Sequence, residues 1–246
     1  MKFRISEKEK FQDNNELNII YKNQYYNIEI DNDAFYLNQD KKIIICIGKI
    51  HNSKNKSTKS EENKLILEEI LSNFNAKYIY DNFFGKYILI LASANKIEII
   101  TDEFSQFDIY YAKMNSSVAV SSDISLLQFD KNNDGYNQNA LAHLLTCYGN
   151  RPAKKETIYN AVKRLGVLES IRIDDNKFDI RKYSFVPKKI KKYNTLDNEH
   201  YYNLFLDTLT KEGSNDGNLV YLSSGWDSTS ILAGLVKIFG NDKVRA

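Results

Sequence analysis

The stretch NLVYLSSGWDSTSILAGLVKIF, residues 218–239, carries the sharpest local pattern in the chain. Its apolar residues at 218–223 predict a strand, and those at 231–239 predict a helix. Residues 224–230 between them form a turn rich in hydroxyl side chains, and another strand is expected to begin at Val244. A strand that turns directly into a helix is typical of an α/β unit and leaves free backbone amides at the helix N-terminus.

This arrangement suits an anion, because the helix dipole adds partial positive charge to the unpaired amides. Ser223, Ser228 and Thr229 are candidate hydroxyl donors to phosphate oxygens, and Gly225 permits close approach of the backbone. Asp227 would be out of place beside bare phosphate unless it held Mg²⁺, which prefers oxygen ligands and bridges to phosphates. The alternative is an ordinary turn in which Asp227 caps the helix, and the spacing does not decide between the two. The GxxxxGK[ST] motif is absent, which excludes the ordinary P-loop.

The composition excludes several classes of protein. The 246 residues are 42% apolar and 27% charged, which predicts one or two globular domains and no disordered chain. A net charge of +2 indicates no nucleic-acid partner. No apolar run approaches the ~20 residues that span a bilayer, and the N-terminus has no apolar signal region, so no membrane association is expected. Cys46 and Cys147 fit buried free thiols in a reducing cytoplasm, and the three histidines show no metal-ligand spacing.

The rest of the chain predicts mixed secondary structure. Short strands rich in β-branched and aromatic residues are expected at 25–30, 43–47, 87–91 and 97–101, with a further hairpin over 169–183. Amphipathic helices are expected at 61–71, 137–147 and 197–211, the last with Asp197 as its cap. The basic stretch 186–193 is interpreted as a linker.

Residues 223–228, SSGWDS, resemble the SGGxDS pyrophosphate loop of the N-type ATP pyrophosphatases, with Ser224 replacing the first glycine. Weaker matches upstream narrow the resemblance to the asparagine synthetase family. They are FGKY at 84–87, TD at 101–102, IYY at 109–111, VAVSSD at 118–123, TIY at 157–159 through RLG at 164–166, and RKY at 181–183. The resemblance covers about residues 40–246 in the family's order.

The resemblance implies α+β followed by α/β architecture. Residues 1–190 would form an antiparallel β-sandwich with helices, of N-terminal-nucleophile glutaminase type, and residues 191–246 would begin a doubly wound ATP pyrophosphatase domain. The implied activity is an ATP-dependent amide-forming ligase, in which a carboxylate is adenylylated and an amine captures the product. The implied cofactors are ATP and Mg²⁺. The implied substrates are a small-molecule or peptide carboxylate and an amine donor. The resemblance leaves open whether the protein forms a homodimer. The implied site residues are Ser223, Ser224, Gly225, Asp227, Ser228 and Thr229, with Asp227 on the metal.

Two departures from the family pattern predict a vestigial glutaminase half without a catalytic residue. The family's cysteine nucleophile stands at position 2, which is Lys2 here. Residues 47–52, IGKIHN, align with the glutamine-holding NGEIYN, but Ile47 and Lys49 replace the asparagine and the glutamate. β-Lactam synthetases and lasso-peptide cyclases are similar in build.

The alternative is a truncated, non-catalytic relative that acts as a binding or scaffolding module. About 50 residues after the linker are too few for a doubly wound sheet. For this chain we therefore expect an ATP affinity no tighter than roughly millimolar. Trp226, the single tryptophan, is expected to fill space behind the loop.

Overall fold

The computed structural model describes residues 2–8, 17–32, 34–52, 61–114, 117–129, 135–146, 155–175, 177–185, 192 and 194–246. The chain divides into two compact units, Met1–Phe185 and Val186–Ala246, and each is described by itself. None of the helices in the described part is both long and apolar enough to cross a membrane. Cys147 and nearly all of the predicted linker lie outside the described residues.

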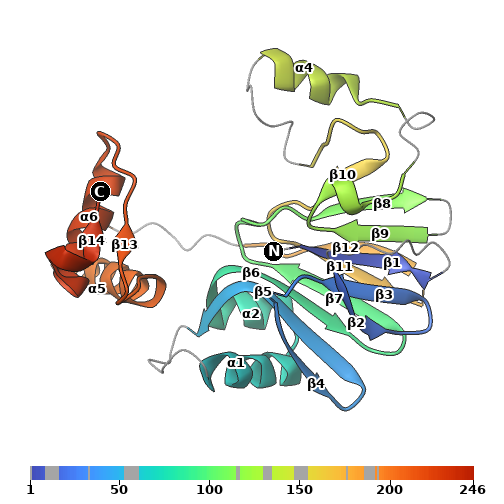
Figure 1. Ribbon diagram of the computed structural model, residues 1–246, viewed down its shortest axis with the longest axis horizontal. Helices are drawn as coiled ribbons and strands as arrows, with labels where there is room; N and C mark the ends of the chain where they lie inside the picture. Colours follow the sequence, from blue (N-terminus) through green and yellow to red (C-terminus); the bar gives the residue numbers. More distant parts are fainter. Residues whose placement is uncertain are drawn as a thin grey trace. The chain divides into compact units, whose positions relative to one another are not determined.

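The first unit contains two stacked antiparallel sheets accompanied by helices (Figure 1), which confirms the predicted α+β sandwich. One sheet has the order β10-β8-β9-β1-β3-β2 and the other β12-β11-β7-β6-β5-β4. The strands of the first sheet are β1 Phe3–Glu7, β2 Asn18–Lys22, β3 Tyr26–Ile30, β8 Tyr110–Met114, β9 Ser117–Ser121 and β10 Val162–Arg164. Those of the second are β4 Phe35–Gln39, β5 Lys42–Asn52, β6 Phe83–Ala92, β7 Lys96–Thr101, β11 Glu169–Asp174 and β12 Lys177–Lys182. The helices are α1 Glu61–Ser72, α2 Ala76–Asn82, the 3₁₀ turn η2 Ile124–Leu126 and α4 Gln138–Thr146.

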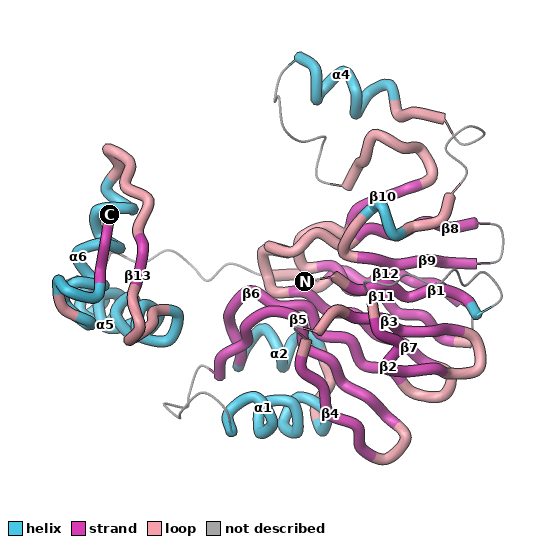
Figure 2. Tube along the Cα trace, in the orientation of Figure 1, coloured by secondary structure: helices cyan, strands magenta, loops and turns pink. Residues whose placement is uncertain are grey.

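Strand β5 shows why parts of this sequence are continuously apolar. Ile43 and Ile45 pack between the two sheets, together with Phe3 of β1. The alternate residues Ile44 and Cys46 face the opposite way, into a second core with residues of α1 and α2. Both faces of β5 are therefore buried, and such strands read as unbroken apolar runs. Figure 2 shows these two helices beside the second sheet.

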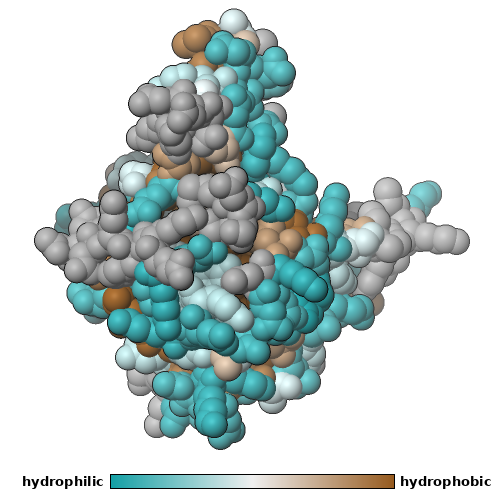
Figure 3. Space-filling model, turned by 90° about the vertical axis from the view of Figure 1, so that its right-hand side faces the viewer, coloured by the Kyte–Doolittle hydropathy of each residue, from teal (hydrophilic) through white to brown (hydrophobic). Residues whose placement is uncertain are grey.

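Strand β11 follows the other pattern, because only one of its faces is buried. Ile171 and Ile173 lie in the core, whereas Ser170, Arg172 and Asp174 are half-buried on the opposite face. This alternation is typical of an antiparallel strand with one face toward solvent. The side of the molecule in Figure 3 is mainly hydrophilic, with apolar residues scattered among polar ones. On its outer face, strand β11 therefore presents the polar side chains of Ser170, Arg172 and Asp174.

The second unit is built around a parallel strand pair. Its elements are α5 Thr195–Glu212, β13 Asn218–Leu219, α6 Trp226–Phe239, the 3₁₀ turn η3 Asn241–Lys243 and β14 Val244–Arg245. β13 and β14 pair in parallel, and Val220, Leu235 and Val244 form a small core with residues of both helices. The order strand, helix, parallel strand is a βαβ unit.

Three predicted boundaries in this unit are wrong. The strand over 218–223 ends at Leu219, because its partner β14 has only two residues, although Val220 N still donates to Arg245 O at 2.8 Å. The helix predicted from Ile231 begins at Trp226, since the hydroxyl residues of the turn continue the helix. Asp197 is not the cap of α5. Asn194 caps that helix and Asp197 lies at the third helical position, where the two side chains form a reciprocal capping box.

Candidate phosphate-binding site

The predicted site residues come together at the start of α6. Ser223 and Ser224 precede the helix, Gly225 is its N-terminal cap, and the other three site residues lie in its first turn. The first backbone bond of the helix runs from Thr229 N to Gly225 O at 3.4 Å. The amides of residues 226–228 precede that bond, so they are the unpaired donors that a helix N-terminus offers to an anion.

Hydrogen bonds between Ser223 and Ser228 join the two ends of the loop. Their hydroxyl oxygens are 3.0 Å apart, and Ser223 N donates to Ser228 Oγ at 3.1 Å. Gly225 N donates to Ser223 Oγ at 3.2 Å, and Thr229 Oγ1 donates to Gly225 O at 3.1 Å. Local hydrogen bonds therefore occupy the hydroxyls of Ser223 and Thr229 and the amide of Gly225. The backbone amides of residues 226–228, more than the predicted hydroxyls, are the groups that remain open.

Asp227 is exposed and forms no ion pair or side-chain hydrogen bond among the described residues. The N-terminus of α6 has no side-chain cap hydrogen bond, so the alternative in which Asp227 caps the helix is wrong. No group of three or more histidine, cysteine or acidic residues that could hold a metal occurs in the described ranges. A lone carboxylate beside an anion-binding loop still suits Mg²⁺, which is usually held by one or two carboxylates together with substrate phosphates.

Gly225 lies close to the side chain of Ser223. A Cβ at Gly225 would have Ser223 Oγ at 3.2 Å as its nearest neighbour, so a side chain there would crowd the inside of the loop. Trp226 does not fill space behind the loop as predicted. It is 89% exposed, because the first turn of α6 directs it away from the core of Val220 and Leu235.

In the first unit, the structure places Lys2 at the start of β1, where the family pattern has its nucleophile. Lys2 N donates to the Asp31 carboxylate, and Lys2 Nζ lies 3.7 Å from Asp123 Oδ2. Hydrogen bonds from the backbone and side chain of Ser125 lower the pKa of Asp123, and the charge of Lys2 lowers it further. A cation paired with a carboxylate cannot attack a glutamine amide.

The glycine-bearing segments of β5 and β6 meet beside two lysines. Gly48 has φ +98° and Gly85 has φ +131°, and a Cβ at either position would lie within 2.4 Å of a carbonyl oxygen of the facing strand. In the same register Lys49 stands directly opposite Lys86, whose Nζ lies 4.5 Å from the centre of the Phe107 ring. Lys49 thus places a cation where the family pattern has an acceptor for the amine of glutamine. Lys86 belongs to the FGKY match at 84–87, but its position opposite Lys49 depends on the strand register, which the sequence does not show.

We expect no glutaminase activity. Cys46 is fully buried, and burial raises the pKa of its thiol, so it cannot serve as a thiolate nucleophile. The purified chain should release no ammonia from glutamine above the blank. Turnover that disappears in Cys46→Ala or Cys147→Ala would show this prediction to be wrong.

Comparisons with known proteins gave structural neighbours only. No protein-family model matches the sequence, and no curated protein matches it. One solved neighbour is glutamine phosphoribosylpyrophosphate (PRPP) amidotransferase from B. subtilis, complexed with ADP and GMP. Its TM-score is 0.34 at 10% identity, over 89% of this chain and 50% of that chain. A second, described as the allosteric regulatory enzyme of purine biosynthesis, has a TM-score of 0.40 at 9% identity, over 97% of this chain and 57% of that one. The chain thus spans little more than half the length of these neighbours, and likeness at this level assigns it neither family nor function.

Proposed function

We propose that this chain is part of an ATP-dependent amide-forming ligase of asparagine synthetase type. In this proposal residues 1–190 are a glutaminase-like domain that no longer hydrolyses glutamine, and residues 191–246 bind the phosphates of ATP. The observation that carries the proposal is the loop at 223–229, which presents open helix amides and an unpaired carboxylate together. ATP and the free thiol of Cys46 fit a cytoplasmic location, which belongs to the same proposal.

The residues of the loop have distinct tasks in this proposal. The amides of residues 226–228 would hold the phosphate oxygens, and Asp227 would hold Mg²⁺ against them. The Ser223–Ser228 pair fixes the shape of the loop before any ligand arrives. The carboxylate would take the adenylyl group from bound ATP with release of pyrophosphate, and an amine would then attack the acyl-adenylate, forming the amide and releasing AMP.

Calorimetry of the whole chain with ATP and Mg²⁺ tests the proposal. We expect a Kd in the millimolar range, about −4 kcal/mol, because the described second unit offers one loop to the phosphates and a single parallel strand pair behind it. Removal of Mg²⁺ with EDTA should weaken binding, because the carboxylate of Asp227 then repels the phosphates. Binding that is unaffected by EDTA would contradict the proposed role of Asp227.

One observation favours the second candidate function, a non-catalytic binding module. Tyr221, just before the loop, is 87% exposed, and Trp226, within the loop, is 89% exposed. Exposed aromatic side chains are enriched at protein interfaces. A chain that binds no ATP at ten millimolar would fit this alternative better than the ligase.

A further inference from the structure

A cavity of about 230 Å³ lies on the outer face of the second sheet, beside the first residues of α2. One row of the sheet crosses it: Ile100 of β7, Ser170 of β11 and Arg181 of β12 are direct neighbours in the strand register. Ser170 is short, whereas Arg172 two residues further on the same face is long, so the sheet is hollowed at Ser170. Phe74 and Tyr183 add aromatic rings to the lining.

The charged side chains that line this cavity are unequal in sign. Four are basic and one is acidic: Lys77, Arg172, Arg181, Lys182 and Glu98. Glu98 is already neutralised, because its Oε1 lies 2.9 Å from Lys96 Nζ and 3.8 Å from Arg172 Nη1. Three of the basic side chains also have acidic partners, since Lys77 pairs with Asp81, Arg172 with Asp174 and Arg181 with Asp179. The donors that these pairs leave open therefore decide what the cavity can bind.

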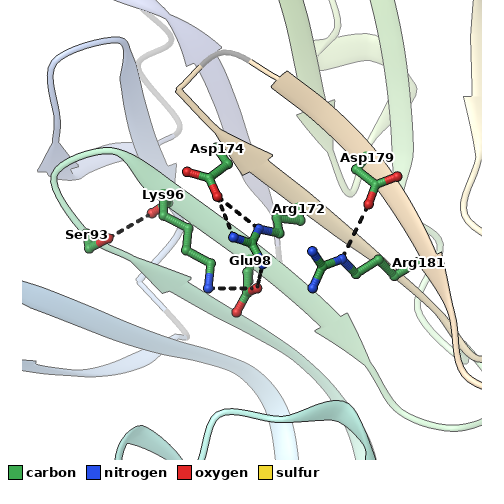
Figure 4. A network of polar contacts seen from close by, with 7 residues as sticks. All are labelled: Ser93, Lys96, Glu98, Arg172, Asp174, Asp179 and Arg181. Carbon is green, nitrogen blue, oxygen red and sulfur yellow. Dashed lines mark hydrogen bonds and ion pairs between the residues drawn. The ribbon is translucent and has the colours of Figure 1, made fainter.

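The two arginines differ in what they can still bind (Figure 4). Arg172 is committed, since Nε donates to Asp174 Oδ2 at 3.1 Å and Nη2 bonds the same carboxylate. Arg181 uses only Nε, which donates to Asp179 Oδ2 at 3.3 Å. Its two terminal nitrogens and the hydroxyl of the neighbouring Ser170 have no partner among the described residues. Arg181 thus has a free pair of donors, the fork geometry that matches a carboxylate or a phosphate.

We propose that this cavity binds a small organic anion. A carboxylate or phosphate group would accept hydrogen bonds from Arg181 and Ser170, which share the outer face of the sheet, and a compact apolar body would lie against Phe74 and Tyr183. The size is sufficient, since cavities of about 150 Å³ hold benzene. The contacts of Arg172 with Asp174 and Glu98 hold the Arg172 side chain in place beside the cavity, so this side of the site is formed before the ligand binds.

The test uses the whole chain and three probes: benzoate, phenyl phosphate and inorganic phosphate. Amide NMR shifts at Ile100, Ser170 and Tyr183 should saturate with one or both aromatic anions, and the preferred one identifies the anionic group. Arg181→Gln should weaken binding at least tenfold, since a charge-assisted bidentate contact is lost. Ser170→Leu fills the hollow at the centre of the cavity and should abolish binding of the aromatic anion. Lys177→Gln is the matched control, because it removes one positive charge from the far end of the same strand, and it should leave the affinity unchanged.

Three results would overturn the proposal. The first is the absence of saturable shifts with both aromatic anions. The second is equal affinity for inorganic phosphate and phenyl phosphate, which would mean charge attraction without a cavity. The third is an equal loss of affinity for the aromatic anion in Arg181→Gln and Lys177→Gln, which would mean non-specific electrostatic attraction to the basic strand rather than a binding site.

Discussion

Replacing Arg4 with methionine is expected to destabilise the first unit by about 3–5 kcal/mol. Arg4 and Glu29 stand directly opposite each other on β1 and β3, and both side chains are at least 94% buried. Arg4 Nε donates to Glu29 Oε2 at 2.5 Å and Nη2 donates to Glu29 Oε1 at 2.9 Å. Methionine has similar length and no charge, so the substitution leaves the Glu29 carboxylate buried and unpaired.

Urea unfolding at neutral pH, followed by circular dichroism, measures this loss. Arg4→Met with Glu29→Leu should recover most of the stability, because no charge then remains buried. Arg181→Met is the exposed counterpart, since it breaks a surface pair with Asp179, and should cost less than about 1 kcal/mol. If Arg4→Met and Arg181→Met lowered the free energy of unfolding equally, the conclusion that the buried Arg4–Glu29 pair is needed for the stability of the sandwich would be contradicted.

In a form of the protein with a complete synthetase domain, Asp227→Asn is expected to lower magnesium-dependent ATP use, measured as pyrophosphate release, by 10²–10³-fold, about 3–4 kcal/mol. Asparagine keeps the size of the side chain but removes the charge that balances the metal. The assay is run at saturating ATP, so that weaker binding does not limit the rate.

Two variants complete this experiment. Asp216→Asn removes an exposed carboxylate from the same unit and should leave the rate unchanged. Ser224→Gly restores the glycine of the family pattern, and the rate should be equal or higher, because Ser224 forms no hydrogen bond through its side chain among the described residues. An unchanged rate in Asp227→Asn would contradict the ligase proposal.

The strands of the sandwich were predictable where the spacing of apolar residues along the chain shows how many faces of a strand are buried. The isoleucine run in β5 and the alternation in β11 each correspond to the number of buried faces. The strand–turn–helix pattern at 218–239 was predictable for a similar reason, because its three parts are contiguous in the chain. Its boundaries were not, since the hydroxyls of Ser228 and Thr229 bond Gly225 O and allow the helix to start five residues early.

Features that depend on strand register could not be predicted. Arg4 and Glu29 are 25 positions apart, and Lys49 and Lys86 are 37 apart, yet each pair is brought face to face by antiparallel pairing. A shift by one residue would move every one of these side chains to the other face. The outer cavity has the same origin, because Ser170 and Arg181 become neighbours only through the pairing of β11 and β12.

Mapping of amide shifts in the whole chain on titration with ATP and Mg²⁺ tests the central claim most directly. If the turn binds the phosphates, the largest shifts fall on residues 225–229, saturate in the millimolar range, and disappear in Asp227→Asn or without Mg²⁺. Shifts that leave residues 225–229 unchanged at ten millimolar ATP, or that persist at full size in Asp227→Asn, would show that this loop is not a magnesium-dependent phosphate site.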